Sequence, residues 1–162
     1  MESVPKGRYP VTVAGARKLE QELESLEQKR GEVSANIRTA KGFGDLSENF
    51  EYHEAKREQG MVEGSIQQLK LIIPQLEVVR PEDVSLEQVG FGAVVSVRED
   101  TGEEWDYFIV GPLEADPMED RISYESPLGS ALLGKRVGDV AEVDAPAGKI
   151  RFTITGIRAY EP

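Results

Sequence analysis

Two stretches of heptad-spaced apolar residues, separated by a short glycine-containing turn, constrain this sequence more than any other feature. The first runs from Ala16 to Ala40 and the second from Tyr52 to Leu76, in steps that alternate between three and four residues. The segment Gly42-Phe43-Gly44 between them supplies two residues that tolerate positive φ. Two such stripes joined by a tight turn can bury each other, so the pattern predicts a long antiparallel α-helical coiled-coil hairpin.

The ends and the interior of this hairpin also carry signals. Thr12 is suited to cap the first helix, and Pro74 is expected to kink or end the second. Each stripe has one polar position, Arg30 and Gln59, at about the same distance from the turn, which predicts a polar layer that helps to fix the register. Arms of about 30 residues give a rod roughly 45 Å long.

The second half of the chain has a different pattern. Short alternating runs at 93–97, 105–110, 140–143 and 150–154 predict strands, and Ser126-Pro127 predicts the start of a short helix that Gly134 ends. The fold class is therefore α+β. We expect two domains, a coiled-coil hairpin at 1–80 and a small sheet domain at 81–162, with a linker near Arg80-Pro81.

Composition and charge exclude several classes of protein. The chain has no cysteine, so disulfides and thiolate metal sites are excluded, and no apolar run approaches the roughly 20 residues that span a bilayer. We expect a cytoplasmic protein without a membrane partner. Residues 1–80 contain 12 basic and 13 acidic side chains, whereas residues 81–162 contain 7 basic and 17 acidic ones. Because phosphate binding depends on Lys and Arg, the second half should repel free nucleic acid.

Asp45 and Glu48 are the candidate functional residues at the tip of the hairpin. One interpretation is structural: an acid before a helix, followed by Glu three residues later, matches a capping box. The other is that two exposed carboxylates contribute to a divalent cation site, although they form an incomplete shell for Mg²⁺ and need ligands from a partner. No nucleophile with a base and no phosphate-binding loop accompanies them, so independent catalysis is not expected.

The residues around this tip resemble the sequence signature of a known family. The matching segments are Gly44-Asp45-Leu46-Ser47-Glu48-Asn49, Glu51-Tyr52-His53, Ala55-Lys56, Val11-Thr12-Val13-Ala14-Gly15, Ser126-Pro127-Leu128-Gly129 and Val137-Gly138-Asp139. They resemble the bacterial Gre transcript-cleavage factors over nearly the whole chain. The acidic composition is similar to the GreA branch of that family.

The resemblance implies a fold and a function. It implies a second domain with an FKBP-like fold and a factor that enters the secondary channel of bacterial RNA polymerase, with this domain at the channel rim. There it stimulates the polymerase's own cleavage of backtracked nascent RNA. Asp45 and Glu48 would help to hold a Mg²⁺ ion shared with the polymerase, so the chain would be no enzyme by itself, would have no cofactor of its own and would act as a monomer. The resemblance also places Lys41 and Lys56 near the RNA.

Two alternatives stay open at this stage. A Gre paralogue could enter the same channel and inhibit the polymerase, although only two acids lie between Gly42 and Asn49 here. A peptidyl-prolyl isomerase or chaperone is the alternative from another class, because the second domain would share its fold with such enzymes. Its pocket would be lined by aromatic residues that we expect instead to form the core: Trp105, Tyr107, Phe108, Tyr124 and Phe152.

Overall fold

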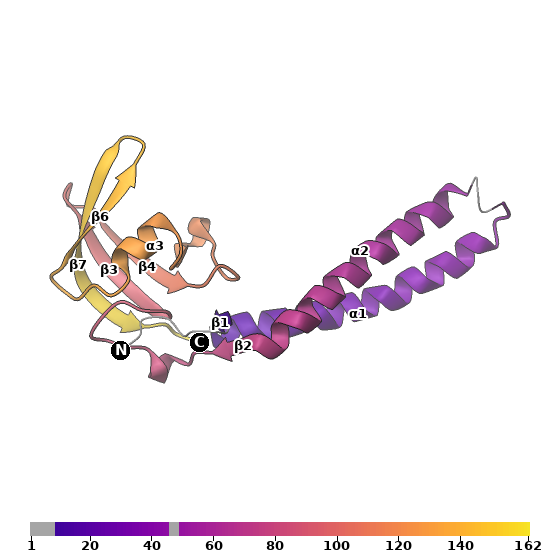
Figure 1. Ribbon diagram of the computed structural model, residues 1–162, viewed down its shortest axis with the longest axis horizontal. Coiled ribbons are helices and arrows are strands. Elements are labelled where there is room, and N and C mark those ends of the chain that lie inside the picture. The colour runs from indigo at the N-terminus through magenta and orange to yellow at the C-terminus, as the bar shows by residue number, and fades with distance from the viewer. Residues whose placement is uncertain (1–8, 46–48) are drawn as a thin grey trace. The chain divides into compact units, whose positions relative to one another are not determined.

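The computed structural model describes residues 9–45 and 49–162, and contacts between residues divide the chain into two compact units (Figure 1). The hairpin unit is Arg17–Gln75. The sheet unit joins Leu76–Pro162 to the chain up to Ala16, which differs from the division at residue 80 that we expected from the sequence pattern. In the described part of the chain, no helix combines the length and apolarity needed to cross a membrane.

The hairpin unit is built from two antiparallel helices, α1 (Val13–Lys41) and α2 (Phe50–Ile72) (Figure 1). Every position of the two predicted stripes is buried or half-buried, and the most deeply buried are Ile66, Val33, Ala40 and Val62. Near the turn, Val33, Ile37 and Ala55 form a buried cluster against Tyr52. The predicted hairpin is therefore confirmed.

Ion pairs between side chains of α1 and α2 also help to align the two helices. Lys29 pairs with Glu58 at 3.3 Å, and Glu27 pairs with Lys70 at 3.8 Å. Arg30, from the predicted polar layer, pairs with Glu63 at 3.8 Å. Arg30 and Gln59 are both half-buried in the stripes, and the long guanidinium side chain of Arg30 reaches a carboxylate one turn further along α2 than Gln59. These pairs are partly exposed, so each one contributes little to stability.

The second helix ends where the sequence places a proline. Pro74 lies in the 3₁₀ turn η1 (Ile73–Gln75), since its ring cannot continue the helical hydrogen bonds of α2. The chain then forms β2 (Leu76–Val78), which pairs in parallel with β1 (Tyr9–Val11). The sequence pattern did not predict this two-stranded sheet.

The main sheet of the sheet unit has five strands in the order β5-β4-β3-β7-β6 (Figure 1). Its strands are β3 (Ala93–Glu99), β4 (Glu104–Val110), β5 (Arg121–Ser123), β6 (Val140–Ala145) and β7 (Gly148–Ala159). Neighbouring strands are antiparallel except β4 and β5, which are parallel. The short elements are η2 (Pro81–Asp83), η3 (Pro117–Glu119) and α3 (Pro127–Leu132).

The core of the sheet unit lies on one face of this sheet. Alternate residues of β3, Ala93, Val95 and Val97, are almost completely buried there, and Leu132 of α3 packs in the same cluster. Because side chains of a strand alternate between faces, this period-two burial places the intervening residues on the outer face. The helical hairpin and the five-stranded sheet together confirm the α+β fold class.

The start of α1 is held within the sheet unit. The Thr12 hydroxyl accepts a hydrogen bond from the Gly15 amide at 3.0 Å, which confirms Thr12 as the cap. The Glu114 carboxylate accepts hydrogen bonds from both the amide and the hydroxyl of Thr12. The Tyr160 hydroxyl accepts from the Val13 amide and donates to the Val79 carbonyl, and burial raises the pKa of this phenol.

Candidate functional site

Asp45 lies in the turn that joins α1 to α2. Lys41 ends α1, and the Gly42 and Phe43 amides donate to carbonyls of its last turn. Gly44 then takes a φ of 110°, a conformation that glycine adopts at low cost, and Asp45 follows as an exposed residue. The second predicted carboxylate, Glu48, belongs to residues 46–48, which lie outside the described residues, so the structure does not position it relative to Asp45.

Asn49 is the residue that connects the two helices at this turn. Its side-chain oxygen accepts a hydrogen bond from the Tyr52 amide at 3.0 Å, which makes it the N-cap of α2. Its side-chain nitrogen donates to the carbonyl of Ala40, in the last turn of α1. One amide therefore satisfies an N-terminal donor of α2 and a C-terminal acceptor of α1.

This geometry corrects the structural interpretation of Asp45. The predicted capping box placed Asp45 at the start of the second helix, but α2 begins at Phe50 and its cap is Asn49. The signal for Asn49 was present in the sequence, because Asn ranks with Asp and Ser as an N-cap residue. The N-cap of α2 is therefore Asn49, whereas the other half of the predicted capping box, Glu48, lies outside the described residues.

The described residues do not form a complete metal site. Across 9–45 and 49–162, no group of three or more His, Asp or Glu side chains is arranged to hold a metal ion. Asp45 is an exposed carboxylate, and carboxylate oxygens are suitable ligands for Mg²⁺, which requires six ligands. Asp45 alone therefore supplies at most part of such a shell.

The two predicted RNA-proximal lysines are both exposed near this end of the hairpin. Lys41 is the last residue of α1, and Lys56 lies in the second turn of α2, where its ammonium group donates to Gln59 Oε1 at 3.4 Å. The neighbouring Arg57 pairs at 2.6 Å with Glu54 of its own helix. Arg57 therefore adds less positive charge to the tip than its sequence position suggests.

The aromatic residues of the sheet unit serve mainly as core. Tyr107 and Phe152 meet edge-to-face at 6.2 Å between ring centroids, and Phe108 stacks on Tyr160 at 5.4 Å. Tyr124 also packs against the core, whereas Trp105 is 42% exposed. Four of the five residues considered for an isomerase pocket are thus used in packing, as expected, and Trp105 is the exception.

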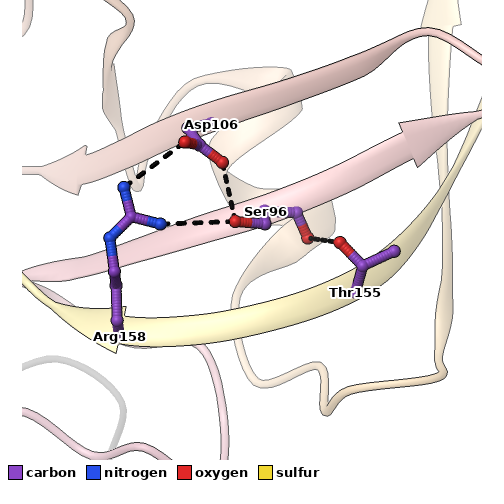
Figure 2. Close-up of polar contacts among 4 residues, drawn as sticks. All are labelled: Ser96, Asp106, Thr155 and Arg158. Carbon is purple, nitrogen blue, oxygen red and sulfur yellow. Dashed lines mark hydrogen bonds and ion pairs between the residues drawn. The ribbon is translucent and has the colours of Figure 1, made fainter.

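The outer face of the sheet carries a polar cluster that links three strands (Figure 2). The Ser96 hydroxyl of β3 donates to Asp106 of β4 at 2.6 Å, and Arg158 of β7 pairs with the same carboxylate at 3.3 Å. The Thr155 hydroxyl donates to the Ser96 carbonyl at 3.1 Å. The hydrogen bond from Ser96 is the largest cause that lowers the pKa of Asp106; burial opposes it, and the hydrogen bond and positive charge of Arg158 lower the pKa further. The cluster aligns strands and has no feature of a catalytic site.

Comparisons with known proteins agree with this architecture. The family model "Transcription elongation factor, N-terminal" matches residues 9–78, and "Transcription elongation factor, GreA/GreB, C-term" matches residues 84–159. Together they cover both the hairpin and the sheet. The chain therefore belongs to the GreA/GreB family of transcription elongation factors.

The chain is also similar in sequence to individual GreA proteins. It is 51% identical over 150 residues to transcription elongation factor GreA of Thermoanaerobacter pseudethanolicus, which covers 91% of this chain and 96% of the relative. It is 50% identical over 153 residues to GreA of Clostridium novyi, with 93% and 96% covered. Among solved structures, GreA factor homolog 1 of Thermus thermophilus is 31% identical, with a TM-score of 0.43 and coverage of 94% of this chain and all of that one.

Proposed function

We propose that this chain stimulates the cleavage of nascent RNA by a backtracked bacterial RNA polymerase. The hairpin tip would enter the polymerase's secondary channel, and the sheet domain would bind at the channel rim. Family membership supports an action on RNA polymerase. The observation that carries the rest is that Asp45 is exposed in the turn of a long hairpin, where Asn49 and not Asp45 caps the helix.

The dimensions of the hairpin fit this role. α1 contains 29 residues, which corresponds to about 44 Å at about 1.5 Å per residue. The hairpin core is made of two helices that bury only each other, so the rod is narrow. A narrow rod with an acid at its end can reach a site that a globular domain cannot enter.

The tip residues would act as ligands and positioning groups. Asp45 and Glu48 would supply carboxylate oxygens to a Mg²⁺ ion shared with the polymerase, and Lys41 and Lys56 would face the phosphates of the extruded RNA. In a centre with two divalent ions, one ion would activate the attacking water and the other would stabilise the leaving oxygen of the phosphodiester. The factor would thus hold no cofactor of its own, perform no catalysis alone and act as a cytoplasmic monomer.

RNA cleavage in a stalled, backtracked complex tests this proposal. The intact protein should accelerate cleavage, and Asp45→Ala and Glu48→Ala should each bind the polymerase but lose most of the acceleration. Binding without acceleration by the intact protein would instead favour the inhibitory paralogue. A Gln68→Ala variant, at an exposed position of α2, is the matched control and should behave as the intact protein.

A further inference from the structure

An open apolar groove lies beside the hairpin turn. Its volume is about 560 Å³, and residues of both helices line it. Three large apolar side chains in this lining are mostly exposed: Phe43 by 65%, Phe50 by 74% and Met61 by 70%. On α2 the lining follows one face of the helix, since Phe50, Glu54 and Met61 are spaced by four and seven residues.

These apolar side chains are not required to hold the two helices together. The hairpin is closed by the buried stripe of Val33, Ile37, Ala55 and Val62, whereas Phe43, Phe50 and Met61 are mostly exposed to solvent. Single exposed apolar residues are common, but a contiguous group beside a functional tip typically marks a binding surface. We therefore expect this groove to be covered by a partner.

The charges around the groove restrict what that partner can be. Glu51, Glu54 and Glu58 line it, and Arg57, the arginine among the described lining residues, is paired with Glu54 at 2.6 Å. RNA is disfavoured because phosphates need unpaired Lys or Arg side chains. A second copy of this chain is disfavoured because it would bring two sets of glutamates together. An apolar protein surface with basic side chains at its edge is complementary.

We propose that this groove binds an apolar and basic wall of the RNA polymerase channel, and so supplies affinity to the hairpin close to its tip. The inference rests on the function proposed above, which already places the tip in that channel. Phe43 directly precedes Gly44 and Asp45, and Phe50 directly follows the cap Asn49. Burial of both aromatic rings would therefore anchor the turn on each side of the carboxylates.

The test separates the affinity of the factor for the polymerase from the rate of RNA cleavage. In the Phe50→Ala/Met61→Ala variant, the apparent Kd for core polymerase should rise at least about tenfold, which is the effect of truncating hot-spot residues in a protein interface. The factor concentration for half-maximal cleavage should rise by the same factor. The variant's cleavage rate at saturation should stay within about twofold. Leu71→Ala is the matched control, because Leu71 is 69% exposed on the same helix but outside the groove, and it should change neither quantity.

Each other outcome has a definite meaning. Unchanged polymerase binding by a folded double variant, verified by far-UV circular dichroism, would overturn the inference. A lower cleavage rate at saturating factor concentration, with unchanged polymerase binding, would also overturn it and would indicate contact with RNA. Self-association of the intact protein in sedimentation, abolished by the same substitutions, would assign the groove to a second copy. Polymerase binding is measured directly, so the inference can hold even if the intact protein proves not to stimulate cleavage.

Discussion

Replacement of Asn49 by alanine tests the geometry of the tip most sharply, because one side chain connects both helices there. The variant removes the cap on the Tyr52 amide and the donation to the Ala40 carbonyl. Loss of an N-cap costs about 1 kcal/mol, and loss of one further hydrogen bond costs about 1 kcal/mol. We therefore expect Asn49→Ala to lower the free energy of unfolding of the hairpin by roughly 2 kcal/mol.

Asn49→Asp separates the two contributions. A carboxylate still accepts from the Tyr52 amide and interacts favourably with the N-terminus of α2, but it cannot donate to the Ala40 carbonyl. The loss of stability should fall to about half that of the alanine variant. Urea unfolding followed by circular dichroism at the helical band measures both variants, and hydrogen exchange of the Tyr52 amide reports the cap directly.

The Gln68→Ala substitution at an exposed position of α2 provides the control and should change stability by less than about 0.5 kcal/mol. The reasoning is refuted if Asn49→Ala is as stable as this control, or if the Tyr52 amide exchanges at the same rate in the intact protein and in Asn49→Ala. Equal losses in Asn49→Ala and Asn49→Asp would show that the bond to Ala40, and not the cap, carries the effect.

Three further predictions concern other parts of the chain. Gly129→Ala should destabilise the sheet unit by roughly 1–3 kcal/mol in chemical unfolding, because a Cβ there would collide with the Ser123 carbonyl. Gly60→Ala should stabilise the hairpin by up to about 1 kcal/mol in the same assay, since the helical position has open space around it. The Asp106 pKa is lowered in the folded protein, so its contribution to stability is present above the unfolded-state pKa of about 3.9 and is lost as pH falls through the folded value. Ser96→Ala should raise this pKa toward its ordinary value in an NMR titration.

The sequence pattern predicted the elements whose signals are long or repeated. Two heptad stripes gave the hairpin, and alternating runs gave strands β3, β4, β6 and β7, although β7 extends to Ala159, beyond the predicted run. Strands β1, β2 and β5 have three residues each, too few for alternation to be visible, and they exist only through pairing with distant segments.

The candidate site was predictable in part. The sequence placed Asp45 at the tip of the hairpin, but at the start of the second helix, where its spacing to Glu48 matches a capping box; in the structure α2 begins at Phe50 and its N-cap is Asn49. The contact from Asn49 to Ala40 could not be predicted, because it joins residues of different helices across the turn. For the same reason, the choice of Glu63 as the partner of Arg30 depends on side-chain reach across the interface.

The Mg²⁺ dependence of stimulated cleavage tests the central claim, that a tip carboxylate acts at a metal centre of the polymerase. The measurement compares the intact protein with Asp45→Asn, both at saturating concentration in a backtracked complex, over a range of Mg²⁺. We predict that the isosteric amide raises the Mg²⁺ concentration for half-maximal cleavage and that high Mg²⁺ restores part of the rate. The same Mg²⁺ dependence and the same maximal rate for both proteins would contradict the account.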